Sequence, residues 1–183
     1  AKEEFAKDYL ANAIKANADY QGGYHLFCPL GRAVISKIAV DIAHKENLKV
    51  IAHGCTGKGN DQVRFEGYIT TLDPTLKTIA PVREWSMGRD EQLEYAKKHG
   101  IPVKQTSTKI YSYDENLWGD SAEGGEIESP SKIPDFANCL ITCTEPEKAP
   151  DQSEMVELEF VEGLPTKLNE KEYRFQYDRS YLE

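Results

Sequence analysis

Apolar residues recur at helical spacing in two stretches near the start of the chain. One predicted helix covers residues 2–16, and a second begins after Pro29 and ends near Asn47. The stripe on the first helix consists of Phe5, Tyr9, Leu10, Ala13 and Ile14. The stripe on the second consists of Leu30, Ala33, Val34, Ile38 and Ile42. Such stripes are typical of helix faces that pack against a core.

Short apolar runs alternate with further helical segments. Residues 48–52 and 76–82 are predicted strands, and a third strand is predicted to start at Ile101. Helices are predicted over residues 62–72 and 88–99 between them. The first strand is almost continuously apolar, which favours burial on both faces of a parallel sheet. This alternation predicts right-handed βαβ units and an α/β fold.

The composition changes near residues 106–108, and the chain beyond is rich in loops. Prolines interrupt it repeatedly. Residues 155–161 show the alternation of a half-exposed strand, and Tyr173, Phe175 and Tyr177 alternate again. We therefore predict an α/β domain over residues 1–106, followed by an α+β segment over residues 107–183.

A glycine-rich turn follows the predicted strand at residues 48–52. It contains Gly54, Gly57 and Gly59, and the next helix begins with Asn60 and Asp61, with Arg64 one turn later. Glycines allow close approach of a ligand, and a helix start presents unpaired N–H groups and positive potential. Two interpretations fit: a structural turn ended by a helix cap, or a ligand-binding loop at the carboxyl end of a strand. The turn is not a G-x-x-x-x-G-K-[ST] phosphate loop, because a glycine follows its lysine.

Charge and cysteine content narrow the possible partners. The net charge of −9 argues against a nucleic-acid partner held by phosphate contacts. We find neither an apolar run of membrane-spanning length nor a signal peptide, so we expect no membrane partner and a cytoplasmic location. The four cysteines favour reduced thiols over disulfides or a metal site. They are Cys28, Cys55, Cys139 and Cys143. Arg32, in the first turn of its helix, is expected to be solvated, with an anionic contact as the alternative.

Five blocks of the sequence resemble argininosuccinate synthetase in both order and spacing. The blocks are residues 24–32, 52–66, 80–85, 95–102 and 111–126. The agreement extends from about residue 3 to residue 165, and the complete glycine-rich turn is its most characteristic part.

The resemblance implies a fold and a reaction. Residues 1–106 would form a parallel-sheet nucleotide-binding domain of the N-type ATP pyrophosphatase kind, and residues 107–183 part of a synthetase domain. The family joins citrulline to aspartate at the expense of ATP. The citrulline ureido oxygen attacks the α-phosphorus and releases pyrophosphate, and the aspartate amine then displaces AMP to give argininosuccinate. Mg²⁺ accompanies the nucleotide, and a homotetramer is implied.

The resemblance also implies site residues at matching positions. ATP would be bound by His53, Gly54, Cys55, Gly57, Lys58 and Gly59. Aspartate would be bound by Thr56, Asn60 and Asp61. Citrulline would be bound by Tyr24, Asn60, Arg64, Ser112 and Ser121. A helix start with an arginine suits a carboxylate, and an acid with nearby hydroxyls suits an ammonium group. No protein metal site and no general base are predicted, so orientation of the reactants would supply much of the rate.

The sequence departs from the family in several places. It lacks the family's leading strand and Ser-Gly-Gly-x-Asp-Thr loop, and it is shorter, with no alignment for residues 166–183. We therefore expect an internal portion of the enzyme that is inactive alone, or else a non-catalytic or split-enzyme module that keeps the amino-acid pocket. Pro29 replaces a small residue, sometimes a citrulline-binding serine, and Cys55 replaces alanine.

Overall fold

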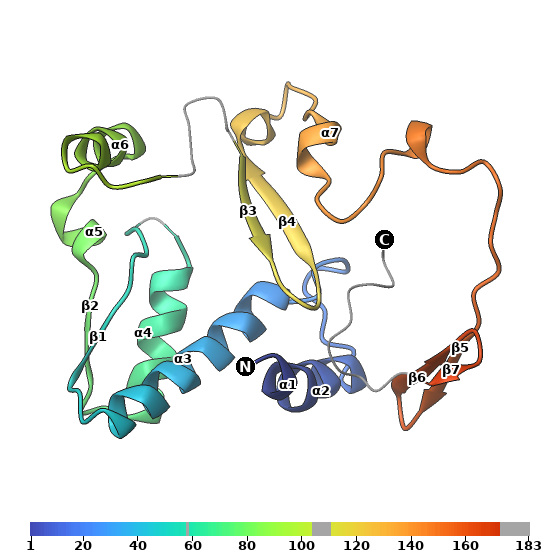
Figure 1. Ribbon diagram of the computed structural model, residues 1–183, viewed down its shortest axis with the longest axis horizontal. Coiled ribbons are helices and arrows are strands. Elements are labelled where there is room, and N and C mark those ends of the chain that lie inside the picture. The colour runs from blue at the N-terminus through green and yellow to red at the C-terminus, as the bar shows by residue number, and fades with distance from the viewer. Residues whose placement is uncertain (58, 104–110, 173–183) are drawn as a thin grey trace. The chain divides into compact units, whose positions relative to one another are not determined.

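The computed structural model describes residues 1–57, 59–103 and 111–172 (Figure 1). The chain divides into two compact units. The first unit combines Ala1–Gly31 with Ile110–Glu183, and the second unit is Arg32–Lys109. Most of the predicted boundary near residue 106 lies outside the described residues, and the division into residues 1–106 and 107–183 stays a prediction.

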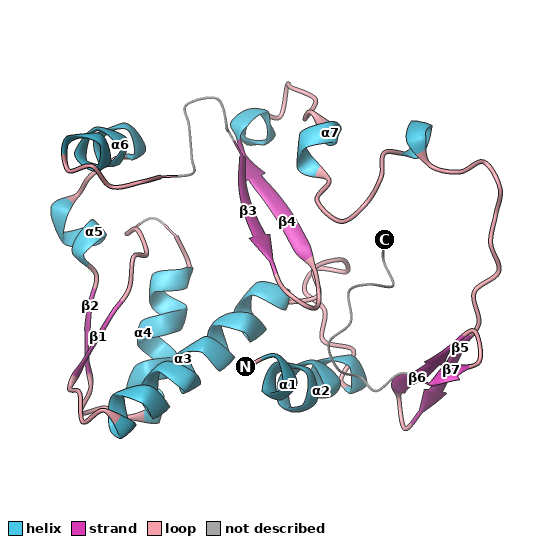
Figure 2. Ribbon diagram, viewed as in Figure 1, coloured by secondary structure: helices cyan, strands magenta, loops and turns pink. Residues whose placement is uncertain are grey.

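The second unit contains a parallel pair of strands and most of the longest helix. Its elements are α3 (Phe27–Lys45, whose first turn belongs to the first unit), β1 (Val50–Ala52), α4 (Asp61–Leu72), β2 (Lys77–Ile79), α5 (Pro81–Trp85) and α6 (Arg89–Lys98). Strands β1 and β2 pair in parallel, with Val50 opposite Lys77 and Ala52 opposite Ile79 (Figure 2). The alternation of helices with parallel strands confirms the predicted α/β class.

One apolar cluster holds α3, α4 and the two strands together. It consists of Val40, Ala43, Ile69 and Leu76, with Ile51 and Phe65 packed against it. The predicted stripe on α3 is only partly right. Val34 is buried, but Ile42 is 51% exposed, and Val40 and Ala43 face the cluster instead.

Strand length and burial differ from the prediction in the second unit. Strand β2 ends at Ile79 rather than Val82, because Pro81 occupies the first turn of α5. Proline has no N–H to give to a sheet, and its φ suits a helix start. Val50 is 44% exposed, so the prediction that its strand is buried on both faces was wrong for the described chain. The strand expected from Ile101 does not form over residues 101–103.

The first unit begins with the predicted helix. Three helical segments run on without a break: α1 (Lys2–Glu4), the π-helical η1 (Phe5–Leu10) and α2 (Ala11–Lys15). The buried side chains of this run are Phe5, Ala6, Leu10, Ala11 and Ala13. The apolar stripe therefore predicted both the helix and most of its buried face.

The rest of the first unit is built from short elements. They are β3 (Tyr111–Glu115), β4 (Asp120–Gly124), η2 (Gly125–Glu128), α7 (Phe136–Cys139), η3 (Pro146–Lys148), β5 (Leu158–Val161), β6 (Leu164–Leu168) and β7 (Lys171–Glu172). Strands β3 and β4 form an antiparallel hairpin, and β5, β6 and β7 form a three-stranded antiparallel sheet. The strand predicted over residues 155–161 forms only from Leu158. Tyr173, Phe175 and Tyr177 lie outside the described residues. No described helix is both long and apolar enough to cross a bilayer.

Asn116 connects the β3–β4 hairpin to Phe27, the first residue of α3. Its Nδ2 donates to the Phe27 carbonyl at 2.7 Å, and its Oδ1 accepts the Trp118 N–H at 2.8 Å. The Trp118 indole donates to the His25 carbonyl at 3.1 Å. A Cβ on Gly119 would lie 3.3 Å from the Phe27 ring, so a side chain at this turn would require the ring to shift by a few tenths of an ångström.

The apolar cluster predicts a stability difference between two positions on α4. Ile69 is 1% exposed, whereas Val63 on the same helix is 70% exposed. We expect Ile69→Ala to lower the free energy of unfolding by about 2–5 kcal/mol, because it leaves a cavity. Val63→Ala, the matched control, should change it by less than about 0.5 kcal/mol. Urea denaturation measures both, and equal effects would contradict the core assignment.

The turn between α4 and β2 predicts an acid-sensitive contribution to stability. Asp73 accepts from the His44 ring at 2.7 Å and from the N–H and hydroxyl of Thr75. These bonds, that from His44 first, lower the pKa of Asp73 from 3.8 to about 2. Because the folded-state pKa is the lower one, the stabilisation is present above 3.8 and is lost as the pH falls toward 2.

Asp73→Asn should therefore be less stable than the unsubstituted chain near neutral pH, and the difference should shrink below about pH 4. Urea denaturation at a series of pH values measures it. A difference that stays constant from pH 6 to pH 2.5 would contradict the assignment.

Candidate functional site

The glycine-rich loop joins the carboxyl end of β1 to the start of α4. Gly54 is exposed, and a Cβ placed on it would meet no atom within 4 Å. Thr56 and Gly59 are also exposed. The side nearest Gly54 is therefore open to a ligand. Lys58, one of the predicted ATP-binding residues, lies outside the described residues.

Asn60 does not act as a capping side chain. It precedes α4 with helical φ and ψ of −72° and −24°, and its side chain makes no capping hydrogen bond. It is exposed, and no hydrogen bond of its side chain is found within the described chain. The interpretation of Asn60 as a capping side chain is therefore wrong, and its amide is available to donate to, and accept from, a ligand.

Asp61 is the centre of an ion-pair network in the first turn of α4. The Arg32 Nε and a terminal nitrogen donate to its Oδ2 at 2.9 and 2.8 Å. Arg64 donates to its Oδ1 at 2.9 Å. The three side chains are partly buried, at 19% exposed for Arg32, 28% for Asp61 and 29% for Arg64.

The expectation that Arg32 is solvated was therefore wrong, and the alternative, an anionic contact, is confirmed. Two nitrogens of its guanidinium donate to the same oxygen of Asp61. A carboxylate oxygen has about two lone pairs, so Oδ2 is saturated and Oδ1 keeps about one position after Arg64 has donated to it. A substrate ammonium would find that one position on Asp61, and Arg64 would present its remaining N–H groups.

Glu66 is the centre of a second network, one turn further along α4. Arg83 donates to its Oε1 at 2.7 Å, and His53 Nε2 lies 3.3 Å from the same oxygen. The Arg83 hydrogen bond, with a smaller contribution from His53, lowers the pKa of Glu66. Glu66 and Arg83 were missed, because α5 is 15 residues distant in sequence and no local pattern links the two.

The side chain of His53 is turned into the fold rather than toward the open side of the loop. It is 9% exposed, stacks on Phe65, and accepts the Cys55 N–H on Nδ1 at 3.3 Å. The ring hydrogen is therefore on Nε2, which donates a hydrogen bond to Glu66. A nucleotide contact by this residue would be made by its backbone. Burial, followed by the charge of Asp61, raises the pKa of the Cys55 thiol.

The two predicted serines lie on one face of the β3–β4 hairpin. Ser112 pairs with Glu123, and Asp114 pairs with Ser121. Ser112 and Ser121 are therefore diagonal neighbours, at a spacing of about 7–8 Å between backbones in such hairpins. Ser112 is exposed and Ser121 half-buried, so both hydroxyls can serve a ligand.

Tyr24, the remaining predicted residue, belongs to the first unit with the two serines. It is half-buried, and its ring packs edge-on against Phe27 with centroids 5.5 Å apart. Its backbone forms a bridge with Tyr20. The structure thus fixes Tyr24 next to α3, whose first residue the hairpin contacts through Asn116.

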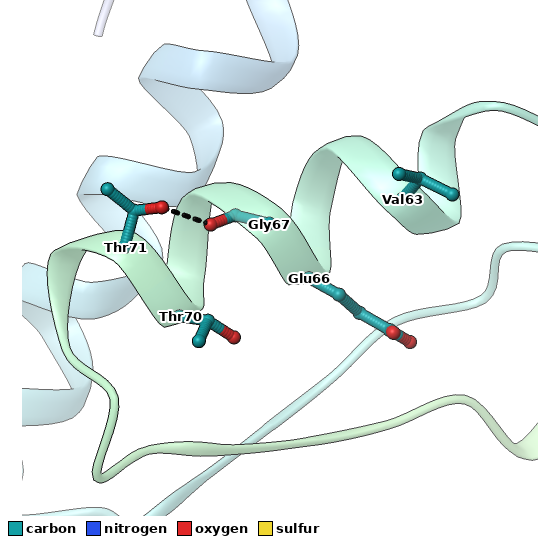
Figure 3. A pocket seen from close by; sticks show the side chains of 5 residues that line it. All are labelled: Val63, Glu66, Gly67, Thr70 and Thr71. Atoms are coloured by element: carbon teal, nitrogen blue, oxygen red, sulfur yellow. Dashed lines mark hydrogen bonds between the residues drawn. The ribbon is translucent and has the colours of Figure 1, made fainter.

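Two surface grooves lie outside the predicted site. One runs along α4 and is lined by Val63, Glu66, Gly67, Thr70 and Thr71 (Figure 3). The Thr71 hydroxyl in it donates to the Gly67 carbonyl at 2.7 Å. The other is lined by Pro134, Asp135, Phe136, Leu140, Glu145, Pro146 and Glu147. Neither groove contains a predicted site residue.

The start of α4 has the chemistry of a site for small zwitterions. It combines an open glycine loop, an unoccupied amide on Asn60, and a carboxylate and a guanidinium that orient each other. Loop backbone and a helix N-terminus suit anionic groups. Within the described residues no three His, Cys, Asp or Glu side chains gather as metal ligands.

Comparisons with known proteins identify the same family along both parts of the chain. A family model described as the arginosuccinate synthase N-terminal HUP domain matches residues 1–102, and one described as the arginosuccinate synthase C-terminal domain matches residues 111–178. The chain is 52% identical to the argininosuccinate synthase of Rubrobacter xylanophilus over 169 residues, which is 92% of the chain and 41% of that relative.

Two further relatives show the same proportions. The argininosuccinate synthase of Thermoanaerobacter sp. is 52% identical over 93% of the chain and 42% of its own length. That of Streptococcus thermophilus is 49% identical over 94% of the chain and 43% of its own length. The chain therefore spans about two fifths of the curated relatives that it matches.

The Asp61 network predicts energetic coupling between Arg32 and Asp61, which are 29 positions apart in the sequence. Arg32→Gln should lower the free energy of unfolding by about 1–3 kcal/mol, because it leaves part of a half-buried carboxylate without donors. In a cycle with Asp61→Asn, the two losses should be less than additive by about 0.5–3 kcal/mol.

Lys45→Gln, on the same helix but with its side chain 80% exposed, is the control. It should change stability by less than about 0.5 kcal/mol. Urea denaturation of the four proteins of the cycle at low salt measures the coupling, since urea does not screen the ion pair. Strictly additive losses would show that the two side chains do not interact in solution.

Proposed function

Because the chain belongs to the argininosuccinate synthase family, we propose that it provides the amino-acid and adenylate side of an ATP-dependent condensation of citrulline with aspartate. The products are argininosuccinate, AMP and pyrophosphate. The observation that carries the proposal is the start of α4, where Asp61 and Arg64 orient each other beside the open loop.

Aspartate binds at the loop and the helix start in this proposal. Its ammonium group takes the remaining acceptor position on Asp61 and the hydroxyl of Thr56, and its carboxylates take backbone N–H groups and the Asn60 amide. Arg64 faces citrulline, whose carboxylate suits a guanidinium. Tyr24, Ser112 and Ser121 supply the other citrulline contacts.

The nucleotide lies along the loop. The proposed ATP-binding residues are His53, Gly54, Cys55, Gly57, Lys58 and Gly59. The absence of side chains at the glycines lets a phosphate or adenosine group approach the backbone. Since the His53 imidazole is committed to Glu66 and Cys55, we assign the nucleotide contact at this position to the main chain.

The chemistry proceeds in two steps. The ureido oxygen of citrulline attacks the α-phosphorus and pyrophosphate leaves, which gives a citrullyl-adenylate. The aspartate amine, freed of its proton, then attacks the ureido carbon, and AMP leaves. The chain's own contribution is to hold the two amino acids in register, because oriented reactants gain a large share of the rate. The ammonium group gives one proton to solvent, which leaves a lone pair for the attack on the ureido carbon and N–H groups that can still donate to Asp61.

Magnesium is implied by the family as a companion of the nucleotide. The carboxylates nearest the loop do not fit a magnesium cage, because Asp61 is held by Arg32 and Arg64, and Glu66 by Arg83. We therefore assign no protein ligand to the metal. Any Mg²⁺ would be bound by phosphate oxygens and water.

Further family features are part of the proposal. We assign residues 1–106 to a nucleotide-binding domain of the N-type ATP pyrophosphatase kind and residues 107–183 to part of the synthetase domain. A homotetramer in the cytoplasm is the proposed assembly and location.

A second candidate is a non-catalytic or split-enzyme module that keeps the amino-acid pocket. It would use the same start of α4, where Asp61 and Arg64 orient each other beside the open loop. Both candidates require binding of aspartate and citrulline, and they differ in whether synthesis follows.

Calorimetry tests the proposal and separates the two candidates. Citrulline and aspartate are titrated into the chain alone, and into the chain supplied with the N-terminal piece of a relative together with ATP. Binding with pyrophosphate release in the second sample supports the enzyme. Binding without pyrophosphate release supports the module. No binding of either amino acid in any sample would contradict both.

Arg64 gives a residue-level prediction. Arg64→Ala should raise the KM for citrulline by about tenfold to a hundredfold in the complete enzyme, because a charge-assisted contact to its carboxylate is lost. The KM for aspartate should change much less, since Asp61 keeps its bonds from Arg32. Steady-state kinetics measures both constants, and an unchanged citrulline KM would remove the role assigned to Arg64.

A further inference from the structure

We propose that Arg83 is a positioning residue that holds the glycine-rich loop in its ligand-binding shape by bridging the loop to α4. This inference rests on the proposed function, since it concerns the same loop, and it adds a residue that has no ligand contact of its own.

The first arm of the bridge reaches the middle of the loop through one glutamine. A terminal nitrogen of Arg83 donates to the Gln62 side-chain oxygen at 3.0 Å. The Gln62 amide nitrogen in turn donates to the Gly57 carbonyl at 2.7 Å. The guanidinium is thus one side chain away from the loop backbone.

The second arm reaches the start of the loop through Glu66. The other terminal nitrogen of Arg83 lies 2.7 Å from Glu66 Oε1, which also lies 3.3 Å from His53 Nε2. His53 accepts the Cys55 N–H on its other ring nitrogen. The loop is therefore held at residues 53–55 and again at residue 57 by groups that share a single guanidinium.

The aliphatic stem of Arg83 completes the contact. A Cβ placed on Gly57 would lie 3.4 Å from the Arg83 Cγ, so the stem lies against the loop at a position without a side chain. Arg83 itself follows β2 on α5, so it ties the carboxyl end of the second strand to the loop that follows the first.

The geometry requires arginine rather than any cation. The guanidinium is planar and offers separate nitrogens to Gln62 and Glu66 at once, whereas an ammonium group is a single point of donation. A lysine at this position would keep the positive charge opposite Glu66 but would lose the hydrogen bond to Gln62.

The bridge is too exposed to matter much for global stability. Arg83 is 38% exposed and Glu66 31% exposed, and ion pairs of this kind contribute little to folding. A role in positioning therefore predicts a large effect on the loop and its ligand with a small effect on unfolding.

The test compares Arg83→Gln, Arg83→Lys and the control Lys97→Gln, which removes a positive charge from an exposed position on α6. Hydrogen exchange without ligand is measured at the loop amide that donates a hydrogen bond, that of Cys55. Aspartate affinity is measured by calorimetry on the same chain with the N-terminal piece supplied. The pKa of Glu66 is measured by NMR titration of its carboxyl carbon.

Arg83→Gln should speed loop exchange and weaken aspartate binding by about tenfold each, the change expected for one charge-assisted hydrogen bond. It should also raise the pKa of Glu66 toward its ordinary value, because the largest cause of the lowered value is removed. In Arg83→Lys the pKa of Glu66 should stay close to its value in the unsubstituted chain, because the positive charge is kept. Loop exchange in Arg83→Lys should stay nearer to that of Arg83→Gln, because one of the two hydrogen bonds is lost. Lys97→Gln should change none of the three.

Two outcomes overturn the inference. One is loop exchange that is unchanged in Arg83→Gln, and the other is faster exchange with unchanged aspartate affinity. A failure of the proposed function gives a different result, since the unsubstituted chain itself would then bind no aspartate.

Discussion

Two carboxylates on the first turns of α4 must be balanced by cations, and the arrangement around the glycine-rich loop depends on this. Asp61 and Glu66 are only partly buried, at 28% and 31% exposed, so their guanidinium partners orient the carboxylates more than they add to global stability. Three arginines meet the requirement, and they come from three different helices, α3, α4 and α5. Because each guanidinium offers several N–H donors, pairing it with a carboxylate also fixes the orientation of both side chains.

The two ends of α4 are therefore held by different forces. Toward its C-terminus, Ile69 is buried in the apolar cluster with residues of α3 and with Leu76, where packing is non-directional and tolerant of small shifts. At its N-terminus, hydrogen bonds of defined geometry set the positions of Asp61 and Gln62. This division suits a helix whose far end supports the fold and whose near end presents groups to a ligand, as the proposed function requires.

Local patterns predicted most helices, because helical periodicity is a property of neighbouring residues. The stripe from Phe5 to Ile14 predicted the first helix, and Gly88 and Gly100 bounded α6 as expected. The predicted end of β2 was wrong because Pro81 starts a helix here, and the sequence alone does not show whether a proline ends a strand or begins a helix. The partners of Arg32 and Glu66 could not be predicted, since they lie 29 and 17 residues away and only the tertiary fold brings them together. The family was found from the order of its blocks, not from any of these contacts.

The thiol of Cys55 makes the loop observable without a label. Alkylating reagents attack the thiolate, and the raised pKa of this group keeps the thiolate scarce near neutral pH. Cys143 is exposed and serves as an internal reference for reagent strength. Iodoacetamide should modify Cys143 faster than Cys55. Any event that loosens the segment between His53 and Thr56 should raise the rate of Cys55 alkylation toward that of Cys143. Peptide mass mapping over a time course would then read out the opening of the loop in the native chain.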